Sequence, residues 1–153
     1  MSPVPPLTPA RGGAASLSPA QAMQHAVAAY QRGDRRAAEQ LCRQVLAAKA
    51  RHFDALYLLA IVAGQSGRAQ EAIELLTRAL SVNPNSADAH FNRGVALGEL
   101  QRPGEALASY ERAIALRPDY ADAYFNRGVA LAELDRPAEA LDSYERAIAL
   151  KPD

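Results

Sequence analysis

The stretch FNRGVA at Phe91–Ala96 recurs letter for letter at Phe125–Ala130, 34 residues further along the chain. The match extends well beyond these letters, because residues 87–119 and 121–153 differ at only six positions. An internal period of this length is typical of arrays in which one supersecondary unit is repeated and stacked. The sequence therefore predicts a repeat protein whose unit is 34 residues long.

Two further units of the same period lie upstream of this pair. A proline recurs once per unit, at Pro84, Pro118 and Pro152. A small residue recurs in all four units, as Ala38, Ala72, Ala106 and Ala140. The first unit is divergent, because Ala50 stands where the other units have proline. We call the units repeat 1 (residues 19–52), repeat 2 (53–86), repeat 3 (87–120) and repeat 4 (121–153).

Apolar spacing predicts that each unit is a pair of helices. Ser18 begins a capping sequence, since Pro19 follows at the first helical position and Gln21 at the third, so the first helix is expected to start there. In repeat 4 the apolar residues keep helical spacing on either side of a break, as Tyr124, Gly128, Leu131 and then Leu141, Tyr144, Ile148.

The turn within each pair is expected to need a left-handed backbone conformation. Gly33 and Gly67 adopt this conformation at little cost because they have no Cβ. In repeats 3 and 4 the same position holds Gln101 and Asp135, and Asp tolerates the conformation better than Gln. The sequence therefore predicts a strained turn in repeat 3. Proline then begins the second helix of each of these repeats, at Pro103 and Pro137.

Composition argues against several classes of protein. Lys plus Arg and Asp plus Glu number 17 each, so net charge does not point to nucleic acid. A single cysteine, Cys42, rules out an internal disulfide framework. No stretch is long and apolar enough to span a membrane, and the N-terminus lacks a signal peptide's apolar segment. Residues 1–17 hold four prolines among the first nine and predict a flexible tail. A cytoplasmic protein that binds neither nucleic acid nor membrane is therefore expected.

These recurring positions resemble the tetratricopeptide repeat, a helix-turn-helix unit with the same period. Its pattern of aromatic, small and apolar residues is met in repeat 4 by Tyr124, Gly128, Leu131, Ala140, Tyr144 and Pro152. Arg127 departs from the pattern, as do His90 and Arg93 in repeat 3. The resemblance covers residues 19–153. It implies an all-α, right-handed solenoid of four helix pairs with a concave groove.

The family's groove is lined mainly by the first helix of each pair, and this resemblance assigns the candidate binding residues. In FNRGVA the Phe, Asn and Val are then expected to face the groove, while the Gly and Ala let the helices pack closely. The assigned residues are Tyr57, Ile61, Asp88, Phe91, Asn92, Val95, Glu99, Asp122, Phe125, Asn126, Val129 and Glu133.

The chemistry of these residues suggests recognition of an extended peptide. A side-chain amide offers two donors and an acceptor, so Asn92 and Asn126 suit peptide groups whatever side chains the ligand carries. The flanking carboxylates favour a ligand with Arg or Lys, although Arg93 and Arg127 are available to pair with them. An alternative stays open, in which the asparagines satisfy backbone groups and the phenylalanines belong partly to the core.

No catalytic or metal-binding pattern accompanies the repeats, and no cofactor is expected. Cys42 occupies a packing position, and there is no phosphate-binding loop or nucleophile motif. The histidines lack ligand spacing, since they fall at different repeat positions as His25, His52 and His90. We therefore expect a protein-interaction scaffold without enzymatic activity. The alternative is that the chain is the recognition arm of a larger enzyme. The sequence of its repeats is similar to the repeats of bacterial O-GlcNAc transferase relatives of the SPINDLY type.

The last repeat also predicts an adhesive surface. Leu141, Tyr144 and Ile148 lie on its second helix with no later helix in the sequence to cover them. Each unit of a solenoid buries one side against its neighbour. We therefore expect this face to be covered by further chain or to mediate end-to-end self-association.

Overall fold

The computed structural model describes residues 15–152, and over that range it is entirely α-helical. Eight helices follow one another: α1 (Pro19–Gln31), α2 (Arg35–Ala48), α3 (Phe53–Gln65), α4 (Ala69–Val82), α5 (Ala87–Glu99), α6 (Pro103–Leu116), α7 (Ala121–Glu133) and α8 (Pro137–Leu150). The expected all-α solenoid is confirmed. Most of the predicted tail, residues 1–14, lies outside the described residues.

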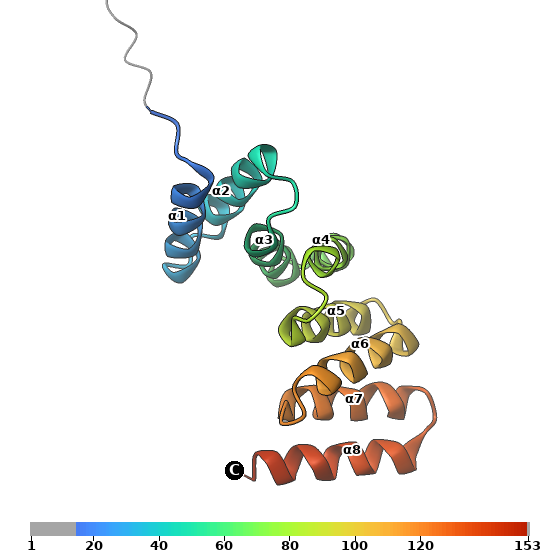
Figure 1. The fold of residues 1–153 in the computed structure, drawn as a ribbon. Coiled ribbons are helices and arrows are strands. Elements are labelled where there is room, and N and C mark those ends of the chain that lie inside the picture. The colour runs from blue at the N-terminus through green and yellow to red at the C-terminus, as the bar shows by residue number, and fades with distance from the viewer. Residues whose placement is uncertain (1–14, 153) are drawn as a thin grey trace, which may run out of the picture.

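The helices stack in chain order, so the molecule is elongated (Figure 1). Each helix packs on the next, and the closest packing joins the two helices of a pair. The first helices of successive pairs also touch one another, from α1 to α3 to α5 to α7. These four helices therefore form a continuous inner wall, while α2, α4, α6 and α8 lie behind it.

The helix ends follow the local sequence as expected. The Ser18 hydroxyl accepts a hydrogen bond from the Gln21 backbone N–H at 3.2 Å, and the Gln21 side chain accepts from the Ser18 N–H at 3.0 Å. This reciprocal pair satisfies two donors that a helix start otherwise leaves free. Prolines occupy the first positions of α6 and α8, where a missing N–H costs nothing.

The turn within each pair does adopt the left-handed conformation. Gly33 and Gly67 have φ angles of 81° and 76°. Gln101 and Asp135 are forced into the same region, with φ angles of 57° and 58°. The predicted positive-φ turn is thus present in all four repeats. In repeat 3 it is adopted by Gln101, and glutamine rarely has a positive φ angle.

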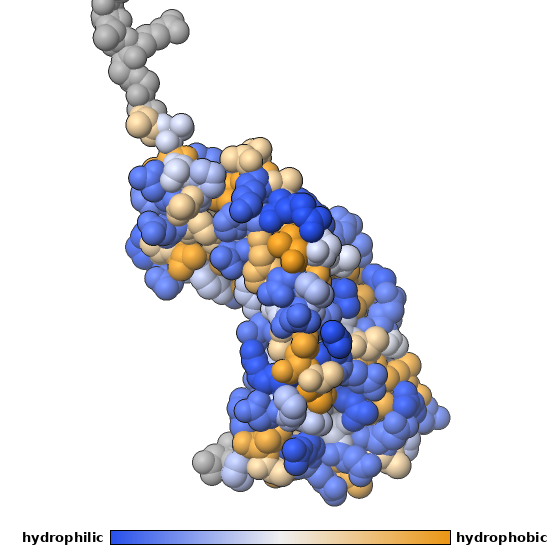
Figure 2. Space-filling view, viewed as in Figure 1, coloured by the Kyte–Doolittle hydropathy of each residue, from blue (hydrophilic) through white to orange (hydrophobic). Residues whose placement is uncertain are grey.

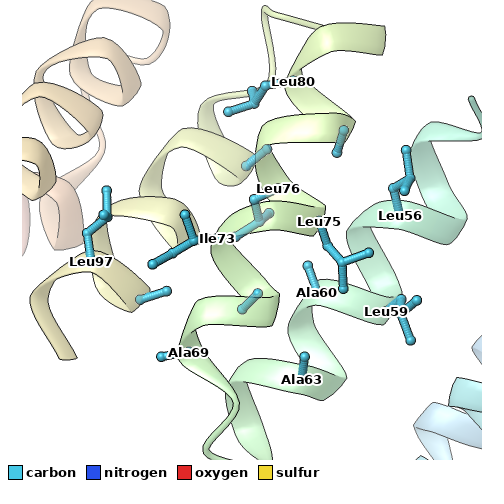
Figure 3. Packing of buried hydrophobic residues seen from close by; sticks show 14 of the residues in the cluster. Leu56, Leu59, Ala60, Ala63, Ala69, Ile73, Leu75, Leu76, Leu80 and Leu97 are labelled. Atoms are coloured by element: carbon cyan, nitrogen blue, oxygen red, sulfur yellow. The ribbon is translucent and has the colours of Figure 1, made fainter. Parts of the chain in front are cut away.

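The core is built from small residues that face larger ones across each helix pair. Figure 3 shows α4 between α3 and α5, with Leu75 pointing toward α3 and Ile73 toward Leu97 of α5. The larger partner in each repeat lies on the second helix, as Cys42, Leu76, Tyr110 and Tyr144. The small residue opposite it on the first helix is Ala26, Ala60, Gly94 or Gly128. Cys42 is fully buried, and burial raises its pKa to about 11, so it packs as an inert apolar side chain.

Candidate functional site

Two hollows on the inner wall repeat with the period of the sequence. The first, which we call hollow 2/3, has a volume of about 220 Å³ and is lined by Ala60, Ile61, Gly64, Gln65, Ala72, Leu76, Asn92, Val95, Ala96 and Glu99. The second, hollow 3/4, has a volume of about 310 Å³ and is lined by Val95, Gly98, Glu99, Ala106, Tyr110, Asn126, Val129, Ala130 and Glu133. Every residue that lines hollow 3/4 has its equivalent, one period earlier, in the lining of hollow 2/3.

The two hollows share a shape but differ in chemistry. Where hollow 2/3 has Gln65 and Leu76, hollow 3/4 has Glu99 and Tyr110. Glu133 adds a second carboxylate to hollow 3/4. Hollow 3/4 is therefore the more acidic and more polar of the two. Of the residues assigned to the groove by sequence, the hollows bring together Ile61, Asn92, Val95, Glu99, Asn126, Val129 and Glu133.

The two carboxylates of hollow 3/4 have no cationic partner within residues 15–152. Glu99 and Glu133 are both exposed, and neither belongs to any ion pair of that range. Their negative charge acts on Tyr110 inside the hollow. The pKa of Tyr110 is raised well above its usual value, mainly by burial and also by the charges of Glu133 and Glu99. A cation placed between these carboxylates is therefore favoured.

The asparagines of the two hollows make different contacts. The Asn92 amide donates to the Tyr57 hydroxyl at 2.9 Å, which joins repeat 3 to repeat 2. The Asn126 amide donates to the backbone carbonyl of Asp122 at 2.8 Å, one turn earlier in its own helix. Among the described residues these are the only bonds of either amide, so one N–H and the carbonyl oxygen of each side chain stay available for a ligand.

Asp88 and Phe91 are already engaged by the chain itself. The Arg117 guanidinium donates to both carboxylate oxygens of Asp88 at 3.0 Å, and the Tyr120 hydroxyl donates to one of them at 2.9 Å. The hydrogen bond from Arg117 holds the pKa of Asp88 below its usual value. The Tyr120 ring lies 4.9 Å from the Phe91 ring, centroid to centroid. This cluster fills the inner wall between repeats 3 and 4 at its edge.

Asp122 and Phe125, the equivalents in repeat 4, lie instead in a third cavity. This end hollow has a volume of about 510 Å³ and is lined by Ala121, Asp122, Phe125, Tyr144, Ala147, Ile148 and Lys151. Phe125 is 54% exposed, and Asp122 is paired with Lys151, whose ammonium lies 3.0 Å away. In Figure 2 apolar atoms lie at the lower end of the molecule, where α7 and α8 form the last layer of the stack. Two residues assigned to the groove therefore belong to the end of the solenoid.

The arginines of FNRGVA turn away from the groove. Arg93 donates to the Ser109 hydroxyl at 3.2 Å, and Arg127 donates to the Ser143 hydroxyl at 2.6 Å. Arg127 also approaches the carboxylate of Glu111, in α6 of the preceding repeat, at 3.5 Å. Both arginines thus bind second helices and do not neutralise Glu99 or Glu133.

Sequence reasoning missed Tyr110 and Lys151, which line hollow 3/4 and the end hollow, and Arg117 and Tyr120, which bind Asp88. They lie on second helices or just after them, outside the first-helix positions to which the groove was assigned. The period did mark two of these positions, since Tyr110 recurs as Tyr144 and the cation of Arg117 recurs as Lys151, whereas Tyr120 has Ser86 as its equivalent and carried no such signal. Within residues 15–152 no group of three or more His, Cys, Asp or Glu side chains gathers that is able to hold a metal ion.

This geometry defines a helical-repeat solenoid with an inner groove. Three family models, each described as a tetratricopeptide repeat, match residues 29–90, 75–108 and 96–153, which together run from 29 to 153. The chain therefore belongs to the tetratricopeptide repeat family.

Solved structures with the same fold agree with this assignment. A crystal structure of MamA is similar with a TM-score of 0.84 and 21% identity, over 88% of this chain and 79% of that one. MamA from Desulfovibrio magneticus RS-1 gives a TM-score of 0.82 and 20% identity, over 88% and 76% of the two chains. YrrB, described as a TPR protein with an unusual peptide-binding site, gives 0.81 and 25% identity, over 89% and 70%.

Two further findings concern relatives and membrane-spanning segments. A search of curated proteins gives no match. No helix among residues 15–152 is both long and apolar enough to cross a membrane.

Proposed function

We propose that this protein is an interaction scaffold that binds an extended peptide segment of a partner along hollows 2/3 and 3/4. The observation that carries the proposal is the repetition of one hollow in two adjacent repeats, each with an asparagine amide at the same place. An extended peptide presents its amide groups at regular intervals, so a regular array of side-chain amides matches its backbone without selecting its side chains.

Hollow 3/4 adds a preference for a basic side chain. Glu99 and Glu133 flank it, and Val129 and the methyl of Ala130 offer apolar contact to the stem of a lysine or arginine. In hollow 2/3 the equivalent of Glu99 is Gln65, whose amide donates to Tyr30 at 2.7 Å and whose oxygen accepts from Arg35 at 3.3 Å. The preferred ligand therefore carries Arg or Lys at the position that meets hollow 3/4, where two carboxylates flank the site, whereas hollow 2/3 has Glu99 alone.

Two findings support a peptide ligand over a catalytic function. The chain belongs to a family of interaction repeats, and one solved structure with the same fold is described as having a peptide-binding site. The inner hollows hold amides, carboxylates and apolar side chains and bring together no nucleophile with a base. These are the groups of a recognition surface.

A displayed library of random peptides, selected on the immobilised protein, tests the proposal. We expect enriched peptides with a recurring Arg or Lys, and we expect Asn92→Ala with Asn126→Ala to abolish their capture. The double variant Glu99→Gln with Glu133→Gln is expected to remove the preference for Arg or Lys in the peptide, while weaker peptide binding is retained. Arg112→Ala, on an exposed position of α6, is the matched control. Capture that survives the asparagine variants and depends on Arg112 places the ligand on the outer face and refutes the proposal.

A further inference from the structure

A further hollow lies between repeats 2 and 3, on the side of α5 that faces away from the groove. It has a volume of about 360 Å³ and is formed by α4, α5 and α6, so both repeats that shape it lie in the middle of the chain. Ile73 and Leu97, which are buried and point toward each other in Figure 3, form its apolar wall. Its charged wall holds Arg93, Arg102 and Glu105. We call it the outer hollow.

Arg93 carries a charge that the outer hollow does not balance. Its Nε–H donates to the Ser109 hydroxyl at 3.2 Å, and among residues 15–152 its two terminal nitrogens have no partner. Arg102 and Glu105 satisfy each other through two bonds of 2.8 Å, so together they add no net charge. Burial lowers the pKa of Arg93, and the charge of Glu105 opposes this. A guanidinium remains charged in proteins, so the free N–H donors of Arg93 are available to an anion.

Between repeats 3 and 4 the equivalent arginine has a carboxylate partner. Arg127 lies 3.5 Å from Glu111, which belongs to the second helix of the preceding repeat. One period earlier, the residue in the place of Glu111 is Thr77. The Thr77 hydroxyl donates to the Ile73 carbonyl of its own helix at 2.8 Å, so its proton is not directed to the outer hollow.

Between repeats 1 and 2 a glutamate also fills the equivalent place. Arg68, the counterpart of Arg102, donates to both oxygens of Glu39, at 3.1 and 2.8 Å. The bond from Arg68 is the main reason why the pKa of Glu39 is lowered to about 2. One period later, the residue in the place of Glu39 is Ile73. The outer hollow therefore lacks the glutamate that each neighbouring junction takes from its own chain.

We infer that the outer hollow binds a glutamate side chain presented by a partner protein. The carboxylate accepts hydrogen bonds from the terminal nitrogens of Arg93, and the methylene groups of the glutamate pack on Ile73 and Leu97. A planar guanidinium matches the two oxygens of a carboxylate, so the pair is strong and directional. Residues 1–18 contain no Asp or Glu, so the N-terminal segment cannot supply this carboxylate.

This inference goes beyond the peptide groove and does not rest on it. The outer hollow shares no lining residue with hollow 2/3 or hollow 3/4. The groove has unpaired carboxylates and favours a basic ligand, whereas the outer hollow has an unpaired guanidinium and favours an acidic one. Failure of one proposal therefore leaves the other standing.

The test follows the Arg93 Nε–H signal by NMR while a capped tripeptide, acetyl-Ala-Glu-Ala-amide, is raised to tens of millimolar at constant ionic strength. We expect a saturable shift of Arg93 and none of Arg127, whose place is already filled by Glu111. The same peptide with Gln in place of Glu is expected to cause no saturable shift, because an uncharged amide does not form the charge-assisted bonds.

Thr77→Glu supplies the missing carboxylate from the chain itself. Thr77 is exposed and its equivalent in repeat 3 is Glu111, so the variant folds. It is expected to weaken peptide binding about tenfold, because the new carboxylate competes for Arg93 and repels the peptide. Gln44→Glu is the matched control, since it adds the same charge at an exposed position of α2 outside the hollow, and we expect it to leave binding unchanged.

Three results overturn the inference. The absence of a saturable Arg93 shift shows that solvent alone satisfies the guanidinium. A shift that Thr77→Glu leaves unchanged places the peptide elsewhere on the surface. Inorganic phosphate that shifts Arg93 at a lower concentration than the glutamate peptide shows that the hollow selects a phosphoryl group and not a carboxylate.

Discussion

Gly94→Ala tests whether the helix pairs are matched in size, residue against residue. A Cβ added at Gly94 lies 2.5 Å from Cε1 of Tyr110, 2.8 Å from Cδ1 and 2.9 Å from Cζ. Non-bonded carbon atoms are at their best separation at about 3.5–4.0 Å, so the ring or the helix has to move by about 1 Å. Tyr110 is only 4% exposed and packs from α6 onto α5, so the ring has to leave this contact and shift toward hollow 3/4, which it lines.

Two opposing terms set the size of the effect. Forcing an extra methyl into a packed core costs about 1–3 kcal/mol. Replacing glycine by alanine inside a helix contributes about 1 kcal/mol of stability, because the unfolded chain loses freedom. The steric term is the larger, so we expect Gly94→Ala to lower the free energy of unfolding by about 1 kcal/mol.

Repeat 2 supplies the compensating change. There the same two positions hold Ala60 and Leu76, both 1% exposed. Adding Tyr110→Leu to Gly94→Ala recreates this pair, so the alanine is expected to become stabilising by about 1 kcal/mol in that background. The coupling energy between the two sites is then about 2 kcal/mol, which is within the range found for residues in contact.

Urea unfolding followed by circular dichroism measures these changes, and hydrogen exchange of α5 and α6 locates them. Gly98→Ala is the matched control, since it lies in the same helix, its Cβ meets only the Tyr110 hydroxyl at 3.9 Å, and repeat 4 has Ala132 there. We expect it to stabilise the protein. If Gly94→Ala stabilises as much as Gly98→Ala and shows no coupling to Tyr110→Leu, the size-matching argument is wrong.

Two buried groups give further predictions. His90 is 8% exposed with its Nε2 bonded to the Pro84 carbonyl at 2.9 Å, and burial lowers its pKa. The folded state therefore holds the neutral ring while the unfolded chain takes up a proton near pH 6.5, so the free energy of unfolding should fall as pH drops below about 6.5 and stay level just above it. His90→Tyr, which copies Tyr124 of repeat 4, is expected to remove that slope in urea titrations at several pH values; an unchanged slope contradicts this. Burial raises the pKa of Cys42 to about 11, so a thiol reagent should label it only as fast as repeat 1 opens, and rapid labelling in native buffer excludes this.

The period, the helical spacing of apolar residues and the resemblance to the tetratricopeptide repeat together predicted the fold, because each repeat is a local unit whose neighbours are set by chain order. The helix starts at Ser18 and Pro103 follow from single residues and their immediate context. The left-handed turns at Gln101 and Asp135 follow from their equivalence to Gly33 and Gly67. Both kinds of feature can be predicted from sequence without knowledge of tertiary contacts.

The candidate site was less predictable, because it depends on side chains that reach from one repeat to another. Asn92 and Asn126, which position in the repeat assigned to the groove, line equivalent hollows, and their role in binding stays a prediction. It gave no indication that Asn92 bonds Tyr57, or that Arg117 and Tyr120 occupy Asp88. These contacts join side chains that are about one period apart in sequence, and only the superhelical packing brings them within bonding distance.

Identical letters in FNRGVA therefore do not give identical chemistry. Phe91 and Phe125 both lie beside the tyrosine of their own second helix, at 5.9 and 5.6 Å between ring centroids. Phe91 is also covered by Tyr120, the last residue of its repeat, whereas Phe125 remains 54% exposed. The surroundings of a groove residue are thus decided by the segment that joins its repeat to the next, here Arg117 and Tyr120, as much as by the letters of its own helix.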